Sequence, residues 1–596
     1  MMPPNMNVHP IGRGAFPLTF ILTTTQLAVW GQGADPVSAK QPTPRQLSRP
    51  AIVRELQDFS LAGMDRRLGP NYAYYHRGIA EEKFPDIWMP PSKQEPGGRR
   101  YQIGGPWTKE AGDFSSTQGQ VLYVPDKDAF GVDRVTILEW SNGCFSERPE
   151  PPWWGGFRPE PTSKVWLEAA NGKPGLPLAM ARGMGSWANC GVILFSSGLV
   201  GSAGTCTAKG SNPTLQFPPN KLPTAISVTS KNEFALVTVC DLKQRKGQVA
   251  VLALEGSGRQ SGFAHEWPDD YPCLPNVAFL TRIKLLGYLD LPGIEFPTGV
   301  TAVGNHQGGR VNGPDGHAGL LRTYDLSKQQ NRDCFRKGSN AGYASTAGFA
   351  VVISRHEGKA AFLDLQPLFQ RANEMYFTTE ENFQETRDSG PGPKQWPYAF
   401  DVDPTWQPAL VKVIDVPEPT AVIADRSGGE KARAYIASLD GNVGLYRLGG
   451  LATEAPATPE GIERVAEVKV GRNPTWLAYQ KYSTDTIIAV SRGDREIAWI
   501  KNAPGGPQVI RRLRDARLID PVFVEMSDTH GIETSLITVA DFQGRKILNY
   551  RFSRVVFATQ GGAQFGMGPE GKDEFECGGI LEFPGSPFCI SATNVN

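Results

Sequence analysis

The sequence predicts an all-β protein made of many short strands joined by turns. Glycine and proline are abundant, with 66 and 49 in 596 residues, a combined share above the roughly 12% of average proteins. Neither residue follows a collagen-like period. Short β-branched and aromatic runs recur between Gly, Asp and Ser turns, as strands and hairpins do. Helical periodicity is nearly absent, and the clearest helix is expected over 365–377, inside an insertion.

Four segments between residues 223 and 552 repeat one order of runs. They begin with PTAISVTS at Pro223, PTAVIADRS at Pro419, PTWLAYQK at Pro474 and PVFVEMSD at Pro521. Each continues into a second and a third apolar run, and a fourth run precedes the next proline. Four strands per unit at this spacing match the blades of a β-propeller. Radial packing buries the faces that a single blade would leave exposed.

Weaker units extend the repeat towards the N-terminus. One begins at Pro297 and resumes at 349–365, so the stretch 304–345 is either a long insertion or part of another blade. Runs at 120–140 and 191–200 give two more units. We therefore expect seven four-stranded blades over 116–560, with six and eight as alternatives.

Strands from the two chain ends usually close such a ring. Here 555–560 is expected to be the outer strand of the last blade. The Gly- and Cys-containing tail, 561–596, is expected to latch the closure.

The repeat also resembles a known family. Asn473-Pro474-Thr475 is followed by IIAVS and then EIAWI, and Pro419-Thr420-Ala421 by AYIAS and then NVGLY. This order resembles the YVTN-type β-propeller repeat, which has a Gly/Asn-Pro-Thr entry, a YVAN-type second strand and a VSVID-like third. The resemblance covers 220–560 well, 115–220 poorly and 35–115 not at all. It implies the fold, but surface proteins, lactonases and electron-transfer subunits all carry similar repeats.

The N-terminal residues predict export. Arg13 is the only charge before Asp35, and the apolar run 15–30 leads to small residues at Gly33 and Ala34. Residues 1–34 therefore match a signal peptide, with a membrane anchor as the alternative. We expect a periplasmic, cell-surface or secreted protein with no transmembrane span after signal removal. Residues 35–115 are a Pro-rich, charged extension of unassigned role.

An exported chain with eight cysteines permits disulfides. We expect the bridges Cys190–Cys206 and Cys577–Cys589, because these cysteines are the nearest neighbours along the chain. No C-x-x-C occurs, so zinc-ribbon, thioredoxin and c-type haem sites lack their ligands. Neither near match to a glycosylation acceptor is usable, because both carry Pro in the middle position, which favours a bacterial source.

Charge excludes some partners. Lys plus Arg and Asp plus Glu both total 61, which argues against nucleic-acid binding and against a polybasic membrane surface. The sequence contains no G-x-S-x-G, H-E-x-x-H or Walker-type motif, and no cofactor-binding residues are identified.

One mouth of the central channel is expected to collect polar residues from the turns between second and third strands. Weak catalytic candidates there are Arg355, His356, Glu357 and Asp440, with His356 as a general base. Candidate oxygen ligands for Ca²⁺ are Asp241, Asp440, Asp494 and Asp541. Ordinary turn geometry also favours Ser, Asp and Gly at such positions.

Two function classes follow. The first is an exported, non-catalytic binding or assembly scaffold in the cell envelope or periplasm, whose partner is another protein or a small polar ligand at the channel mouth. The alternative is a lactonase-like hydrolase with a polar or divalent-cation site at that mouth. The absence of a catalytic motif leans towards the first. An electron-transfer role would need a redox cofactor from a partner chain.

Overall fold

The computed structural model describes most of the chain beyond residue 117. The described residues are 118–125, 137–141, 158–159, 177–183, 190–204, 213–256, 267–275, 280–305, 311–313, 321–424, 431–480, 485–526, 532–558, 564–567, 575–582 and 585–592. The expected signal peptide at 1–34 and the Pro-rich extension at 35–115 lie outside these residues.

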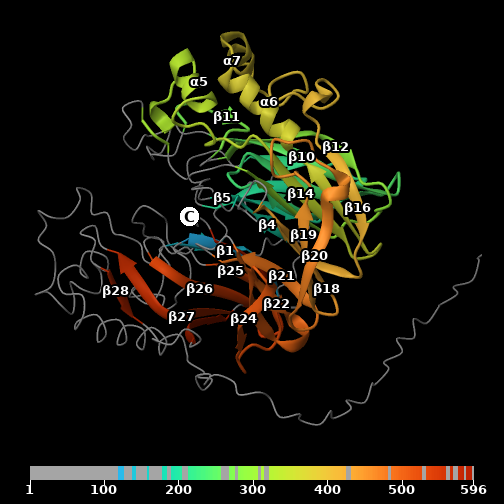
Figure 1. Cartoon of the computed structure of the whole chain (residues 1–596), viewed down its shortest axis with the longest axis vertical. Coiled ribbons are helices and arrows are strands. Elements are labelled where there is room, and N and C mark those ends of the chain that lie inside the picture. The colour runs from blue at the N-terminus through green and yellow to red at the C-terminus, as the bar shows by residue number, and fades with distance from the viewer. Residues whose placement is uncertain are drawn as a thin grey trace, which may run out of the picture. The chain divides into compact units, whose positions relative to one another are not determined.

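The described strands form seven antiparallel sheets arranged as a β-propeller (Figure 1). The first strand of one sheet contacts the first strand of the next around a ring. The contacts run from β4 to β8, β13, β17, β21, β25 and β30, and from β30 back to β4. The predicted all-β propeller fold is therefore confirmed.

Six of the sheets are built from strands that are consecutive in the chain. The first three contain β4 (Pro177–Ala181), β5 (Cys190–Phe195), β6 (Leu199–Gly204) and β7 (Thr214–Gln216); β8 (Lys221–Val228), β9 (Phe234–Asp241), β10 (Lys246–Gly256), β11 (Tyr271–Pro272) and β12 (Leu280–Asp290); and β13 (Gly299–Gly304), β14 (Gly348–Ser354), β15 (Lys359–Asp364) and β16 (Ala409–Asp415).

The other three consecutive sheets come from the C-terminal half. They contain β17 (Pro419–Ala424), β18 (Ala434–Ser438), β19 (Asn442–Leu448) and β20 (Ile462–Lys469); β21 (Pro474–Tyr479), β22 (Thr486–Ser491), β23 (Glu496–Ala503) and β24 (Gly506–Arg514); and β25 (Pro521–Met526), β26 (Ile532–Asp541), β27 (Lys546–Ala558), β28 (Gln564–Met567) and β29 (Phe575–Glu582). Two sheets exceed the expected four strands, because β12 pairs with β10 and β29 pairs with β27.

The remaining sheet joins the two ends of the described chain. Its order is β3 (Arg158–Pro159), β2 (Ile137–Ser141), β1 (Gln118–Pro125) and β30 (Gly585–Ala592). The innermost position is held by β30, which also contacts β25 and β4. Residues beyond 560 therefore contribute β28, β29 and β30 to the sheets. The stretch 555–558 continues β27, so the expected separate outer strand at 555–560 is wrong.

The predicted bridge between Cys577 and Cys589 is wrong. Cys589 is a free thiol and is buried, with its Sγ 3.8 Å from the carbonyl oxygen of Met180 on β4. The physical reason is that Cys577 belongs to β29 and Cys589 to β30, and these strands pair in different sheets. Cys206, one partner of the other expected bridge, lies outside the described residues.

Proline marks the start of the innermost strands. In five sheets the residue after this proline is an extra one in the ladder, so the register shifts there. The prolines are Pro177, Pro223, Pro419, Pro474 and Pro521. Proline lacks an N–H, so the first residue of a strand suits it, and a bulge bends the strand at that point. The repeated Pro-Thr of the sequence therefore marks the bend near the start of an innermost strand.

The apolar core lies between neighbouring sheets. One cluster joins Val192 and Leu194 of β5 to Val237 and Val239 of β9. Equivalent clusters join the sheets of β13–β16 and β17–β20, of β17–β20 and β21–β24, and of β21–β24 and β25–β28. These sheets therefore bury apolar residues against their neighbours, which is the radial packing that stabilises a propeller.

Two insertions, between β13 and β14 and between β15 and β16, carry the α-helices of the described residues. Val300 of β13 pairs with Val352 of β14, so the stretch between them is a long insertion and not a further blade. It holds η5 (Leu321–Thr323) and α5 (Gln329–Arg336). Helices α6 (Gln366–Phe377), α7 (Glu380–Thr386) and η6 (Pro404–Trp406) follow β15, so the predicted helix at 365–377 is confirmed. Two further 3₁₀ turns are η8 (Pro459–Gly461) and η9 (Arg492–Asp494).

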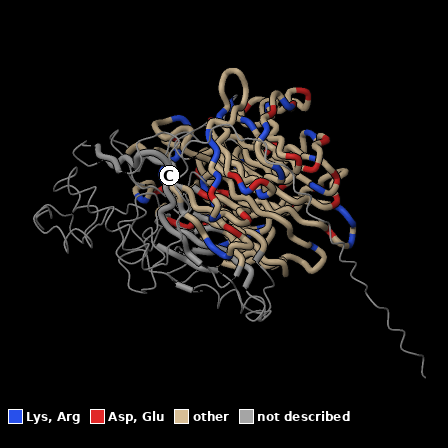
Figure 2. Tube along the Cα trace, turned by 90° about the horizontal axis from the view of Figure 1, so that it is seen from below, with Lys and Arg blue, Asp and Glu red and all other residues tan. Residues whose placement is uncertain are grey.

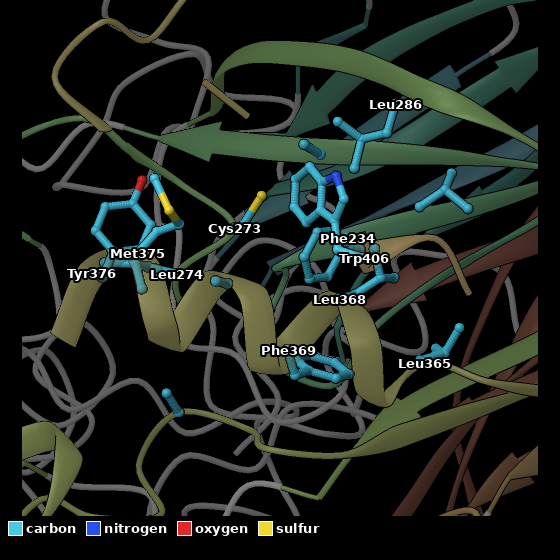
Figure 3. Close-up of a cluster of buried hydrophobic side chains, with 14 of the residues drawn as sticks. Phe234, Cys273, Leu274, Leu286, Leu365, Leu368, Phe369, Met375, Tyr376 and Trp406 are labelled. Carbon is cyan, nitrogen blue, oxygen red and sulfur yellow. The ribbon is translucent and has the colours of Figure 1, made fainter. Parts of the chain in front are cut away.

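Helix α6 packs its apolar face on the sheet of β8–β12. Leu368 and Phe369 lie beside Phe234 and Trp406 in one buried cluster (Figure 3). The ring centroids of Phe234 and Phe369 are 5.6 Å apart, edge to face, a favourable geometry for aromatic pairs. This cluster fixes the insertion between β15 and β16 to the ring.

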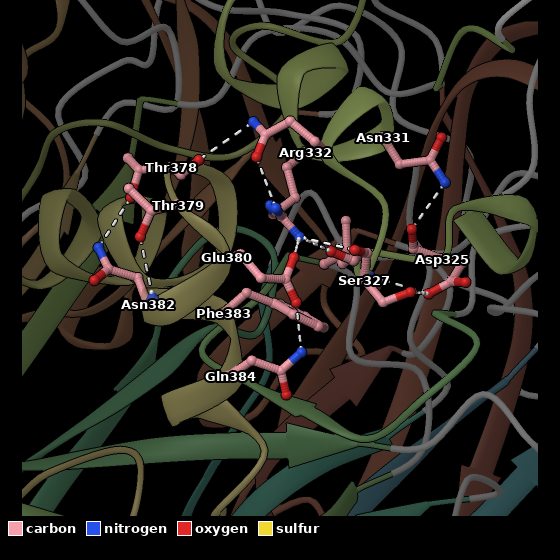
Figure 4. Close-up of polar contacts among 12 residues, drawn as sticks. Asp325, Ser327, Asn331, Arg332, Thr378, Thr379, Glu380, Asn382, Phe383 and Gln384 are labelled. Atoms are coloured by element: carbon pink, nitrogen blue, oxygen red, sulfur yellow. Dashed lines mark hydrogen bonds and ion pairs between the residues drawn. The ribbon is translucent and has the colours of Figure 1, made fainter.

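A buried arginine joins two of these helices. Arg332 on α5 is 1% exposed. Its Nη1 donates to the carbonyl oxygen of Leu326 at 2.8 Å and lies 2.7 Å from a carboxylate oxygen of Glu380, at the start of α7 (Figure 4). A buried charge needs such partners, so the pair orders α5 against α7. No helix among the described residues is long and apolar enough to cross a membrane.

We predict that packing of β30 is essential to stability. Ile590 is 2% exposed and lines the centre of the ring. Ile590→Ala should lower the free energy of unfolding by about 2–5 kcal/mol, the usual cost of emptying a buried site. Urea denaturation followed by tryptophan fluorescence measures the loss.

Ile510 on β24 is the matched control, because it is 49% exposed. Ile510→Ala should change the unfolding free energy by no more than about 0.5 kcal/mol. Equal effects of the two substitutions would contradict the packing of β30 at the centre.

Candidate functional site

The turns between second and third strands lie on one face, together with the loops that precede the innermost strands. We call this surface the entry face. Hydrogen bonds link these segments from one sheet to the next. Arg492 donates Nε and Nη2 to the carboxylate of Asp520 at 2.6 and 2.8 Å, and the amide of Asn473 donates to the carbonyl of Leu439 at 2.8 Å. The channel mouth predicted from the sequence is thus a continuous surface.

The carboxylates predicted as cation ligands on this face accept hydrogen bonds from neighbouring loops. Asp541 accepts hydrogen bonds from the amides of Ile519 and Asp520 at 2.7 and 2.8 Å. Asp494 accepts from the amide and the Nε of Arg472 at 2.7 and 2.8 Å. In each case a turn carboxylate ties down the loop that enters the same sheet.

Asp241 has the same role in the sheet of β8–β12. It accepts from the Nζ of Lys221 at 2.7 Å and the Nδ2 of Asn220 at 3.0 Å, and from two amides of its own turn. The bond from Lys221 holds the pKa of this carboxyl far below its usual range, although burial opposes the shift. A carboxylate with these partners is committed to its loop.

The structure does not assemble the predicted cation site. No group of three or more His, Cys, Asp or Glu side chains lies close enough to hold a metal ion within the described residues. Asp440 is exposed and accepts from the amide of Asn442, two residues on. Asp241, Asp440, Asp494 and Asp541 belong to four different sheets, which separates them around the ring.

The catalytic candidates lie in two turns: Arg355, His356 and Glu357 share the turn between β14 and β15, and Asp440 lies in the turn between β18 and β19. His356 and Arg355 are exposed at the tip of a turn, and the amide of Arg355 donates to the Oγ1 of Thr298 at 3.1 Å. Glu357 accepts from the amides of Glu295 and Phe296, both at 3.2 Å, and from the hydroxyl of Ser354. Glu357 is therefore held by its own entry loop. His356 lies exposed at the tip of the turn.

The innermost strands enclose a narrow central cavity. Its volume is about 100 Å³, below the roughly 300–1,000 Å³ of usual ligand pockets. The wall is mostly apolar, and Trp476 stacks on Phe523 with ring centroids 4.1 Å apart. Glu525 and Arg182 add one charge of each sign to the wall.

Small hydroxyl side chains of the cavity wall join neighbouring sheets. The Oγ of Ser227 accepts from the amide of Ala302 at 3.0 Å, and the Oγ1 of Thr301 accepts from the amide of Ala424 at 3.0 Å. These amides belong to the next innermost strand along the ring, which the sheet ladders do not reach. The hydroxyls are thus structural links.

Sequence analysis missed a buried polar turn at the opposite end of the channel. Residues Thr229 to Glu233 join β8 to β9, and each is 2% exposed or less. Their order, TSKNE, has the composition of a solvent-exposed turn, so no signal in the sequence marks their burial. The insertion between β13 and β14 covers Lys231. The Nζ of Lys231 donates to the carbonyl of Tyr343 at 2.9 Å and lies 3.7 Å from the centroid of the Tyr343 ring.

Burial shifts both charged residues of this turn towards their neutral forms. Burial lowers the pKa of Lys231 to about 7, and Glu233 opposes the shift. Burial also raises the pKa of Glu233, although the hydroxyl of Thr229 and two amides oppose this. Groups with such shifts are candidates for functional sites, but buried structural pairs show them as well.

Comparisons with known proteins give only distant similarities. No protein-family model matches the sequence, and no curated protein matches it. The chain is similar to the structure of a Pseudomonas aeruginosa periplasmic gluconolactonase, with 12% identity, a TM-score of 0.38 and coverage of 80% of this chain and 100% of that one.

Two other solved structures show similarity of the same order. A functionally unknown protein from Desulfotomaculum acetoxidans has 8% identity and a TM-score of 0.36, covering 78% of this chain and 99% of that one. The WD40 repeats of RRP9 have 10% identity and a TM-score of 0.33, covering 68% and 80%. Similarity at this level carries no argument about function.

We predict that Lys231 makes stability depend on pH. Between about pH 7 and its ordinary pKa of 10.5, the unfolded chain binds more protons at this residue than the folded chain. The unfolding free energy should therefore rise with pH above 7. Lys284, whose pKa burial lowers to about 8, should add to the rise above pH 8. Urea denaturation across pH 6 to 9 measures the slope.

Lys231→Met should flatten the slope that begins near pH 7, while the component from Lys284 remains. Lys394 is exposed, so Lys394→Met is the control and should leave the slope unchanged. An unaltered pH dependence in Lys231→Met would contradict the buried position of this amine.

Proposed function

We propose that this protein is a non-catalytic binding or assembly scaffold, exported to the cell envelope or periplasm. One observation carries the proposal: turn carboxylates of the entry face are hydrogen-bonded to the loops of their own sheets. These side chains maintain the surface instead of meeting a substrate. The apolar run at 15–30 and the small residues after it support export.

The narrow cavity supports the same proposal. A volume of about 100 Å³ holds a few water molecules or a very small ligand. The stacked rings of Trp476 and Phe523 form part of the cavity wall. Recognition is then a property of the outer surface, where the loops and the helical insertion vary most from sheet to sheet.

A closed ring of seven blades belongs to this proposal, with the sheet of β1, β2, β3 and β30 as the seventh. Contacts of β30 with both β25 and β4 support it, and so does the position of Cys589 beside Met180. A scaffold gains from closure, since a closed ring leaves only short strand edges exposed.

The alternative, a lactonase-like hydrolase with a polar or divalent-cation site at the mouth, gives a sharp test. Purified mature protein should contain much less than one equivalent of metal by elemental analysis. It should show no turnover above the buffer blank in a panel of lactones and esters. The reason is that Asp241, Asp494 and Asp541 already accept hydrogen bonds from their loops.

Asp440→Ala and His356→Ala supply the controls, because both residues are exposed and their removal should not unfold the chain. A metal content near one equivalent, with turnover that either substitution abolishes, would overturn the scaffold function and establish the hydrolase.

A further inference from the structure

Three arginines occupy equivalent positions with an unusual backbone conformation. In six sheets the residue before the third strand has a positive φ. Three of these residues are Gly198, Gly358 and Gly441, and glycine adopts this conformation without steric cost. The other three are Arg245, Arg495 and Arg545, each with φ of 52°. Side chains with a Cβ are strained there, so this position carries a charged residue where glycine would fit better.

All three arginines are exposed. The side chain of Arg245 is 83% exposed, and Arg495 and Arg545 are also exposed. Backbone strain kept at an exposed position indicates a role outside folding. Arg245 has a distant partner, a carboxylate oxygen of Glu295 at 3.9 Å, a contact of little value at this exposure.

In the turns between second and third strands, basic side chains are more exposed than acidic ones. The exposed charged residues of the described turns between second and third strands are Lys243, Arg245, Arg355, Arg495 and Arg545, against Asp440 alone. Acidic residues of the same turns lie deeper: Asp241 is 2% exposed and Asp541 is 0% exposed. The whole chain has zero net charge, and basic and acidic positions are intermixed along the described part of the backbone trace (Figure 2). Cations at the turn tips are therefore a local excess.

Apolar side chains lie in the same loops. Leu242, Phe296 and Ile519 are 54%, 38% and 43% exposed. Leu242 belongs to the turn of Arg245, while Phe296 and Ile519 precede β13 and β25. Partly exposed apolar side chains in the same loops as cations add apolar area that a docking protein can bury.

We propose that the entry face binds an acidic peptide segment of a partner protein, one that carries carboxylates together with apolar side chains. This inference rests on the proposed scaffold function and names its partner. Arginine binds carboxylate through two parallel hydrogen bonds, and the exposed apolar residues take the peptide's leucine-like side chains. Glu295, Glu418 and Asp440 interrupt the cationic surface, which disfavours a uniform polyanion.

The test uses the full-length mature protein and a fluorescein-labelled peptide of alternating Glu and Leu. Fluorescence anisotropy should show saturable binding that weakens as salt is added. A matched peptide with Lys in place of Glu should not bind. The triple variant Arg245→Gly, Arg495→Gly, Arg545→Gly should raise the Kd at least about tenfold.

Glycine at these positions also separates binding from folding. The triple variant should melt at the same temperature as the parent or higher, because glycine relieves the strain at φ of 52°. A second triple variant, Arg336→Gln, Arg447→Gln, Arg464→Gln, removes as many charges from α5, β19 and β20. It should keep the parental Kd.

Each remaining outcome overturns the inference. These are no saturable binding, an unchanged Kd in the glycine variant, a lower melting temperature with unchanged binding, or tighter binding of an oligonucleotide or of phosphatidylglycerol vesicles than of the peptide. Failure of the scaffold function is distinguishable, because it would appear as turnover in the hydrolysis panel whether or not the peptide binds.

Discussion

The pairing of β30 with β1 is the constraint on which the rest of the propeller depends. Every other sheet is made from neighbouring segments of the chain, but this one requires residues 118–125 to meet residues 585–592. Without that meeting, β25 and β4 would each lose the neighbour that β30 provides. Their apolar faces would then open to water, at a cost proportional to the exposed area.

Closure also explains how the central wall is built. Neighbouring innermost strands belong to different sheets, so backbone ladders cannot join them. Ser227 and Thr301 supply single hydrogen bonds across the gap, and each is worth about 1 kcal/mol net. Such links form only when neighbouring sheets pack side by side, so local hydrogen bonding and global topology reinforce each other.

The sequence predicted much of the fold, because the repeat has a local cause. Pro419, Pro474 and Pro521 each begin an innermost strand as expected, since proline at a bent entry is visible in the residues themselves. Pro177 also begins an innermost strand, but the residues around it match the repeat too weakly to mark it. Residues 585–592 were assigned to a tail, since nothing in GSPFCISA reveals that its partner strand lies near residue 120.

The candidate site was less predictable. The order of strands places its residues in the turns of one face. The role of its carboxylates was not accessible, because the amides that bind Asp541 lie 22 and 21 residues earlier, at Ile519 and Asp520, and sequence does not show such partners. Burial of Lys231 was hidden for a similar reason: the insertion that covers it comes from more than a hundred residues away.

The single thiol at the seam has one more consequence. Cys589 lies on the strand that closes the ring, and burial raises its pKa to about 12. A protonated, enclosed sulfur reacts very slowly with electrophiles. Alkylation at this position would therefore require β30 to part from β4. The alkylation rate would then measure how often the propeller opens transiently at this strand, separately from global unfolding.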